Sequence, residues 1–198
     1  MATKIQRCSW CGDDELYCTY HDEEWGVPLS NEQKLFEFLA LESAQAGLSW
    51  ITILRKRENY RKAFKQFEIA TVARFTKASV ERLMLDPGIV RNRAKIEATI
   101  NNAQRFLEVQ AEYGRFALYL WDFVDGSPQQ PARRAMKDIP ATTSLSDKIA
   151  NDLKKRGFKF LGSTTVYAFM QATGMVNDHI VTCHRHPVCV ELGKRFTV

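Results

Sequence analysis

The chain has 198 residues, of which 45% are hydrophobic, and its 28 basic and 23 acidic residues give a formal charge of +5. That length suits a single domain over residues 1–198 with a sizeable core. No run of about 18 apolar residues is present, which excludes a membrane-spanning helix. The first seven residues also lack the apolar core of a signal peptide, so we expect a cytoplasmic protein.

Helical patterns dominate the chain. Ser30 and Gln33 resemble a capping box that opens a helix running towards Ala46, and Gly47 fits its C-terminal stop. Further helices are predicted over residues 49–62, 69–75, 79–85, 91–113 and 116–123.

The later half begins with a Pro-rich basic loop at residues 126–140. Ser144 with Asp147 forms a second capping-box pattern, opening a helix towards Arg156, and a last apolar helix covers residues 164–173. Strand signals are weak because no alternating run of convincing length occurs. The sequence therefore predicts an all-α fold of two small helical lobes, with the terminal segments as a possible separate module.

The cysteines and histidines cluster at the two ends of the chain. Five cysteines, an odd number near histidines, favour a metal over disulfides. One ligand set is local: Cys8, Cys11, Cys18 and His21. The other joins both ends: Cys8, His21, His179 and Cys183, with the last two on one helical face. Either set makes a closed tetrahedral zinc site with no position left for catalysis, and spacing alone leaves both sets open.

One carboxylate interrupts an apolar stripe. Glu42 continues the helical spacing of Leu35, Phe38 and Leu39, and an inward carboxylate is costly unless it is paired or serves a ligand. A pairing with an arginine and a pocket role are both open. Gln45, which donates and accepts hydrogen bonds, and Trp50 just beyond the helix favour a pocket.

Aromatic side chains gather around His21. Tyr17, Tyr20 and Trp25 are separated by short polar segments, a pattern that suits stacking on a nucleobase, although most such residues belong to cores. Trp10 and Trp121 we assign to the core.

Pro87-Gly88 marks a turn between two predicted helices. The amides at the start of the next helix are donors for a phosphate, and Arg91, Arg93 and Lys95 add positive charge. Basic residues also gather at 55–57, 133–134 and 154–159, which favours a nucleic-acid partner despite the modest net charge.

Several segments together resemble a known family. The segments on which the resemblance rests are Tyr17-x2-Tyr20-His21-Asp22-x2-Trp25-Gly26-Val27-Pro28, Gln45-Ala46-Gly47-Leu48-Ser49-Trp50-Ile51-Thr52, Lys56-Arg57-Glu58-Asn59-Tyr60-Arg61, Lys154-Lys155-Arg156-Gly157-Phe158-Lys159-Phe160 and Asn177-Asp178-His179. They closely resemble the 3-methyladenine DNA glycosylase I family, a divergent branch of the helix-hairpin-helix glycosylases, from about Cys8 to Cys183.

The resemblance implies a fold and a reaction. It implies a two-lobed helical glycosylase with a helix-hairpin-helix element at about residues 79–106, and terminal segments, about 1–28 and 174–190, joined by one structural zinc ion. The enzyme would act as a monomer on double-stranded DNA, flip out 3-methyladenine and hydrolyse its N-glycosidic bond, which releases the free base and leaves an abasic site.

The resemblance also implies residue roles. It selects the zinc set that joins both ends: Cys8, His21, His179 and Cys183. It makes Glu42 the pocket carboxylate, Tyr20 and Trp50 base-contacting aromatics, and Tyr17 a pocket wall, with Gln45 beside them. Gly47 and Leu48 would probe the gap left by the flipped nucleotide, and the amides of Gly88 and Val90 would bind phosphate beside Arg91 and Lys95.

Two features depart from the wider superfamily. Val90 stands where its hairpin usually has a second glycine, and no clear motif surrounds Glu108, Glu112 or Asp122 in the region of its usual catalytic aspartate. No lysine follows the hairpin where a lyase nucleophile belongs, so strand cleavage is not expected.

Two rival interpretations remain open. One is a zinc-bearing nucleic-acid binder without activity, and the other is an enzyme that acts on free nucleotides or RNA.

Overall fold

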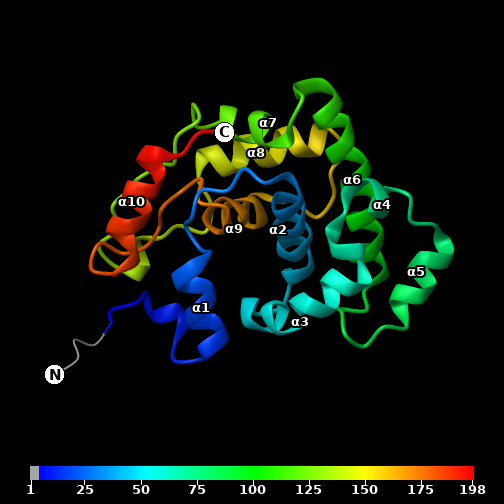
Figure 1. The fold of residues 1–198 in the computed structure, drawn as a ribbon, viewed down its shortest axis with the longest axis horizontal. Helices are drawn as coiled ribbons and strands as arrows, with labels where there is room; N and C mark the ends of the chain where they lie inside the picture. The colour runs from blue at the N-terminus through cyan, green and yellow to red at the C-terminus, as the bar shows by residue number, and fades with distance from the viewer. Residues whose placement is uncertain (1–4) are drawn as a thin grey trace.

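The structure, a computed structural model, describes residues 5–198, and its regular elements in that range are helices joined by loops (Figure 1). The α-helices of this range are α1 (Glu15–Glu23), α2 (Glu32–Gln45), α3 (Trp50–Ala63), α4 (Ile69–Ala73), α5 (Lys77–Met84), α6 (Arg93–Tyr113), α7 (Phe116–Asp122), α8 (Ser144–Lys155), α9 (Ser163–Ala172) and α10 (Arg185–Arg195). Three short 3-10 helices, η1 (Ser9–Cys11), η2 (Lys65–Phe67) and η3 (Met136–Asp138), complete them. Over these residues an isolated bridge between Gln129 and Val176 is the β-type pairing found, so the all-α prediction is confirmed.

Helix α2 forms the centre of the molecule. It packs against α9, α6 and α3, while α4 and α5 cover α6 and α8 covers α9 (Figure 1). Its burial is almost complete from Leu35 to Ala44, because neighbouring helices surround it on several sides. Stacked rings of Phe106 and Phe116, 4.0 Å apart, extend the core towards α7.

Both predicted capping residues are wrong by one position. The side chain that caps α2 is Asn31, whose Oδ1 accepts from the amide of Lys34, and Ser30 precedes it. At α8 the cap is Thr143, whose hydroxyl accepts from Ser146, so the predicted pair of Ser144 and Asp147 is displaced. Asn and Thr are good caps too, and neighbouring polar residues make the exact position ambiguous from sequence.

The terminal segments contain two helices that the sequence analysis did not predict. Helix α1 starts at an Asp14 cap, and α10 tolerates Pro187 because that residue lies in its first turn, where no intrahelical donor is needed. A further expectation is wrong: His179 and Cys183 lie on a turn before α10, closed by the Cys183 amide on the Ile180 carbonyl, and not on a helical face.

The terminal segments meet through a close backbone approach. Gly174 ends the α9 region with φ of 68°, and a Cβ at this position would lie 2.3 Å from the backbone of Val27. The predicted single domain and its terminal segments, about 1–28 and 174–190, stay predictions, and residues 1–4 of the first segment lie outside the described range. Within residues 5–198 no helix is long and apolar enough to cross a membrane.

Candidate active site and metal centre

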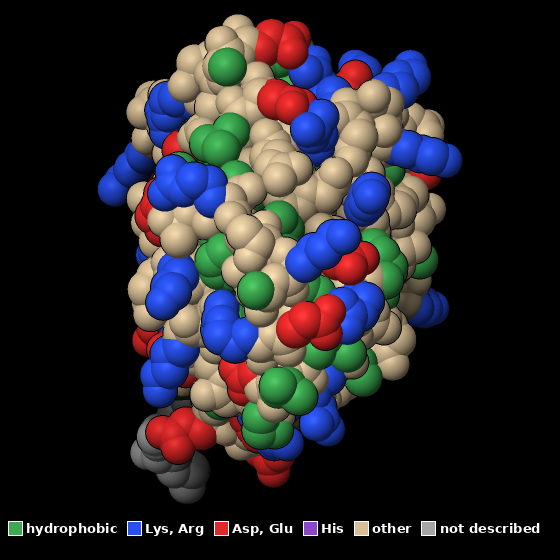
Figure 2. All heavy atoms as spheres, turned by 90° about the vertical axis from the view of Figure 1, so that its right-hand side faces the viewer, with side chains coloured by type: hydrophobic (Ala, Val, Ile, Leu, Met, Phe, Trp, Pro, Cys, Tyr) green, Lys and Arg blue, Asp and Glu red, His purple; other side chains and the backbone are tan. Residues whose placement is uncertain are grey.

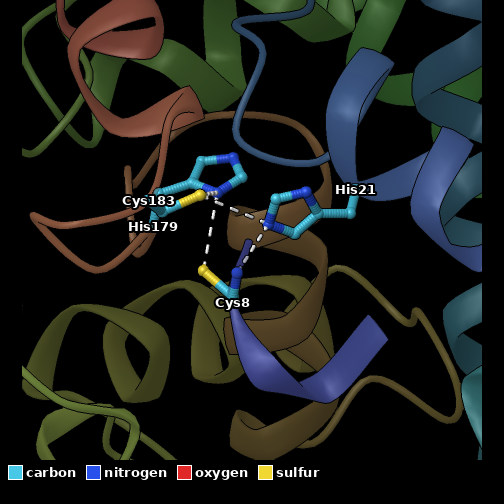
Figure 3. A group of neighbouring side chains, drawn as sticks. All are labelled: Cys8, His21, His179 and Cys183. Atoms are coloured by element: carbon cyan, nitrogen blue, oxygen red, sulfur yellow. Dashed lines mark hydrogen bonds between the residues drawn. The ribbon is translucent and has the colours of Figure 1, made fainter. Parts of the chain in front are cut away.

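Four buried side chains from both ends of the chain converge on one point (Figure 3). Cys8 precedes η1, His21 is in α1, and His179 and Cys183 are on the turn before α10. The Cys183 Sγ lies 3.5 Å from His21 Nε2 and 3.5 Å from His179 Nδ1, and the Cys8 Sγ lies 3.7 Å from that same Nδ1. The structure thus brings together the set that joins both ends.

The outward nitrogens of both imidazoles have partners that fix the tautomers. His179 Nε2 lies 2.9 Å from the carbonyl oxygen of Trp25, and His21 Nδ1 lies 2.7 Å from Asp22 Oδ1. Arg7 in turn donates to that carboxylate. A nitrogen that donates outwards leaves the other ring nitrogen with a lone pair for a metal, which is the usual outer-shell arrangement of metal sites.

The distances fit a tetrahedral ion. Zinc–sulfur bonds of about 2.3 Å and zinc–nitrogen bonds of about 2.1 Å place neighbouring ligand atoms about 3.6 Å apart. Three of the observed separations, 3.5 to 3.7 Å, match that spacing, and all four ligand atoms lie within 4.8 Å of one another. The hydrogen bond between the two thiols lowers the pKa of Cys183 and raises the pKa of Cys8. The residues therefore fit a metal ion held by two cysteines and two histidines.

Cys11 and Cys18 from the alternative local set face elsewhere. The thiol of Cys11 donates to the Cys8 carbonyl, and that of Cys18 donates to the Gly12 carbonyl. Both thiols therefore have backbone acceptors close to them in the sequence, and neither belongs to the converging cluster.

A cavity of about 250 Å³ opens beside this cluster, where α1, α2, α3 and α9 meet. Five of the residues predicted from the sequence lie in its wall: Tyr17, Tyr20, Glu42, Gln45 and Trp50. Helix α1 supplies the two tyrosines three positions apart on one face, α2 supplies Glu42 and Gln45, and Trp50 begins α3. The structure thus joins residues from three helices in one site.

Glu42 is the one carboxylate among the described residues of the cavity wall. Its side chain is only 4% exposed, and no hydrogen bond to it occurs within residues 5–198. Burial raises its pKa to about 8. The same burial, with Glu42 nearby, raises the pKa of Tyr20. A buried acid without a protein partner is costly, which is the situation expected of a group that waits for a ligand.

Two indole donors in the wall are likewise free. The Nε1 atoms of Trp50, which is 8% exposed, and of Trp10 are buried without a hydrogen-bond partner in the described part of the chain. Buried indole N–H groups usually have a partner. The cavity wall therefore combines flat rings with one acid and two indole donors, none of which has a hydrogen-bond partner among residues 5–198.

The assignment of Trp10 to the core is wrong, and four further wall residues were not predicted. Trp10 lines the cavity, its ring 5.0 Å from Trp25, which also lines it, whereas Trp121 is fully buried in the core as predicted. The missed wall residues are Met136, Ile139, Ala168 and Gln171. The first two lie in the Pro-rich stretch, whose sequence carries no periodic signal, so only tertiary structure reveals them.

The metal cluster and the cavity share their supports. Trp10 follows Cys8 by two residues, Tyr20 precedes His21, and the Trp25 carbonyl accepts from His179. Gly26 makes room for this contact, because a Cβ there would lie 3.0 Å from the His179 ring. An ion at the cluster would thereby hold one aromatic wall of the cavity in place.

A second, smaller cavity continues from the first towards the surface. Gly47 and Leu48 lie on one side and Thr164 and Thr165 of α9 on the other, and Glu42 borders both cavities. Gly47 adopts φ of 81°, and Leu48 is exposed. The loop predicted to probe DNA therefore stands at the mouth of the site.

The predicted hairpin differs from its expected state. The Gly88 amide donates to Asp86 Oδ1 at 2.7 Å, and the Val90 amide donates to the Tyr60 hydroxyl at 3.1 Å. The ammonium of Lys95 donates to the Ala44 carbonyl at 2.9 Å and to that of Ala46. These donors already have partners inside the protein.

Arg91 remains exposed at the start of α6. Figure 2 shows the side of the molecule on which α5 lies in Figure 1, and basic side chains are spread among acidic ones there. Of the carboxylates considered from sequence, Glu108 pairs with Arg105 and Glu112 with Arg156, and the cavity wall as described includes neither of them nor Asp122.

Comparisons with known proteins identify the family. The model of the methyladenine glycosylase family matches residues 10–186. The chain belongs to the methyladenine glycosylase family. Among its members, DNA-3-methyladenine glycosylase 1 of Escherichia coli is 50% identical over 183 residues, which are 92% of this chain and 98% of that protein.

Solved structures of the family agree with the fold. A crystal structure of 3-methyladenine DNA glycosylase I is 52% identical, with a TM-score of 0.89 over 92% of this chain and 100% of that one. A variant of such an enzyme, solved in complex with 3-methyladenine, is 40% identical, with a TM-score of 0.90 over 92% of this chain and 98% of that one. The chain thus shares the architecture of these solved structures over nearly its whole length.

Proposed function

We propose that this chain excises 3-methyladenine from alkylated double-stranded DNA in base-excision repair, by hydrolysis and without strand cleavage. The observation that carries the proposal is the buried, unpartnered carboxyl of Glu42 among the rings of Tyr17, Tyr20 and Trp50. The relatives named DNA-3-methyladenine glycosylase and the solved complex with 3-methyladenine support it.

The chemistry of the lesion matches the cavity. Methylation at N3 gives the adenine a positive charge, which weakens the glycosidic bond and makes the base a good leaving group. The flipped base leaves the duplex and stacks on the aromatic walls, at a cost of a few kcal/mol for unstacking. Glu42 then favours the cationic base over neutral adenine, because the carboxylate is stabilised only when a positive partner arrives.

The reaction needs only positioning and this charge selection. The bond between C1′ and N9 breaks with its electron pair staying on the base, and the oxygen of water bonds to C1′. The proton lost from that water passes to solvent, leaving an abasic site. Gln45 borders both cavities, so its amide lies beside the path between base and sugar.

For the metal site we propose one zinc ion held by Cys8, His21, His179 and Cys183. When bound, the ion supplies structural closure of the two chain ends, since four protein ligands leave no open position. For DNA we propose that Leu48, on the turn at Gly47, fills the gap left by the flipped nucleotide.

We further propose that residues 79–106 act as a helix-hairpin-helix element that binds phosphate. Arg91 is an available donor, whereas the amides of Gly88, Val90 and Lys95 would have to exchange their present partners. The expectations of a monomer and of a cytoplasmic location stay predictions.

Released bases from methylated duplex DNA, separated by chromatography, test the proposal. We expect 3-methyladenine release by the wild type and a rate about 100-fold lower in Glu42→Gln, a typical effect of one catalytic charge. Glu108→Gln, an exposed acid outside the cavity, is the matched control and should act like the wild type. Duplex binding without any base release would favour the rival of an inactive binding module.

A further inference from the structure

The loop from Gly157 to Gly162 holds an aromatic side chain in an unfavourable position. Phe160 has a φ of 58°, in the left-handed region that bulky residues rarely adopt, and its side chain is 43% exposed. Its neighbours Phe158 and Leu161 are buried and anchor the loop. A glycine or asparagine would satisfy this backbone without strain, so the exposed ring is held there against its local preference.

The backbone of this loop is clamped by helix α6. Fully buried Asn102 donates to the Lys159 carbonyl at 2.9 Å and accepts from the Lys159 amide at 2.8 Å, while Asn101 donates to the Gly157 carbonyl at 2.8 Å. A loop held by three side-chain hydrogen bonds does not collapse to bury its phenylalanine. The ring is therefore presented to the surface by a rigid support.

The same helix also holds the loop of Leu48. Lys95 of α6 donates to the carbonyls of Ala44 and Ala46, and it precedes Asn102 by seven positions. Residues seven apart share one helical face and lie about 10 Å apart along the axis. One face of α6 thus fixes both the loop of Leu48 and the loop of Phe160.

The two loops also flank the mouth of the site. Leu48 and Gly47 lie across the smaller cavity from Thr164 and Thr165, and the loop of Phe160 leads directly into these residues. Lys154, Lys155 and Lys159 are exposed around Phe160, so an apolar ring stands within a basic surface. Phosphates complement that charge, and bases offer flat faces or gaps to such rings.

We propose, on the basis of the function inferred above, that the loop Gly157–Gly162 is a second DNA-contacting element. Phe160 packs against the bases or sugars of the duplex beside the flipped nucleotide, and Lys159 contacts a phosphate. Together with Leu48 it grips the duplex on two sides of the lesion. This assigns a role to the Lys154–Phe160 motif, which the base pocket and the metal cluster leave unexplained.

Binding to a short duplex with a tetrahydrofuran abasic analogue, measured by fluorescence anisotropy, tests this role. Phe160→Ala should weaken binding about fivefold or more, the range of a lost aromatic contact to a base. Lys159→Gln should lower the slope of log affinity against log salt by about one. Leu192→Ala, an exposed apolar residue on α10, is the control and should bind like the wild type.

Phe160→Gly separates DNA contact from folding. Glycine relieves the left-handed strain, so this variant should melt no lower than the wild type and yet lose as much duplex affinity as Phe160→Ala. Wild-type affinity in both variants would overturn the proposal, and so would a loss confined to the glycine variant, which would indicate loop rigidity alone.

Binding of free 3-methyladenine, followed by tryptophan fluorescence, tells the two proposals apart. Unchanged base binding with weakened duplex binding supports the role of Phe160. A wild type that binds the duplex but neither binds nor releases 3-methyladenine would refute the proposed function, whatever the variants do.

Discussion

The metal cluster and the base cavity lie side by side, but they differ in whether their polar side-chain atoms have partners within the described residues. At the cluster, both outward imidazole nitrogens have partners in Trp25 and Asp22, and the inward atoms face one another. In the cavity wall, the carboxyl of Glu42 and the buried indole N–H groups of Trp10 and Trp50 have no hydrogen-bond partners among residues 5–198.

The difference separates two kinds of site. A group whose partners are all inside the protein contributes to the fold, whereas a buried polar group without a partner costs free energy until a ligand arrives. By this criterion the cluster is a structural element and the cavity is a binding site. Substitutions in the two regions should therefore have opposite effects on stability.

The largest effect is expected from the metal cluster. His179→Ala should lose the ion and destabilise the protein by more than about 3 kcal/mol, because apparent binding energies of structural zinc are on the order of 10 kcal/mol. Atomic absorption and thermal melting measure both effects. Cys11→Ser and Cys18→Ser should keep the ion, and loss of metal from either would instead favour the local ligand set.

Loss of the ion should also weaken base binding in the adjacent cavity. Because the Trp25 carbonyl accepts from His179, and Trp10 follows Cys8, removal of the ion with a chelator should also weaken binding of free 3-methyladenine. Chelated protein that binds the base with unchanged affinity would show that the two regions are independent.

The second effect concerns the protonation of Glu42. Its pKa rises from 4.5 in the unfolded chain to about 8 in the fold, so the native state holds a proton that the unfolded state has released. Its contribution to stability is therefore fully present below about pH 4.5 and is lost as the pH rises towards 8.

Glu42→Gln removes this dependence. We expect the variant to be about 2–4 kcal/mol more stable than the wild type at pH 8, and the two to differ little near pH 4.5. Urea unfolding at both pH values measures the difference. The neighbouring Tyr17 and Tyr20 are common to both proteins and cancel in the comparison. A stability difference independent of pH would show that Glu42 has a partner.

The sequence carried different amounts of information for these regions. The fold class followed from helical periodicity, and the positions of Tyr17, Tyr20 and Glu42 in one cavity followed from spacing and resemblance. The Asp14 cap and the spacing of Tyr17, Tyr20 and His21 were a signal for α1, but the acidic residues on both sides of this segment obscured it.

Other features depend on contacts between distant segments and have no local signature. Met136 and Ile139 reach the cavity from a loop without periodicity, and Trp10 became a wall residue only because Cys8 is held at the cluster. Likewise the partners of the Val90 amide and of Lys95 lie 30 and 51 residues away, beyond any local pattern.

A smaller effect is expected at the hairpin, where the criterion of satisfied donors predicts a structural role for Gly88. Its φ is ordinary, but a Cβ would lie 2.9 Å from both Asn59 and Asp86, whose carboxylate accepts from its amide. Gly88→Ala should therefore cost about 1–3 kcal/mol by overpacking. Denaturant unfolding checks this, with Gly114→Ala reporting the cost of a left-handed glycine that has open space around it.

The smallest effect is expected from Lys95, which the sequence assigned to DNA and the structure ties to the end of α2. Its ammonium satisfies carbonyls that a helix C-terminus leaves free, so Lys95→Met should cost about 1 kcal/mol in urea unfolding. If the residue is purely structural, the salt dependence of duplex binding should equal that of the wild type. Arg91→Gln, with its exposed side chain, should lower that salt slope by about one. A lower slope in Lys95→Met as well would show that its ammonium leaves α2 for a phosphate. A donor with a partner inside the protein would then not be a sign of a purely structural role.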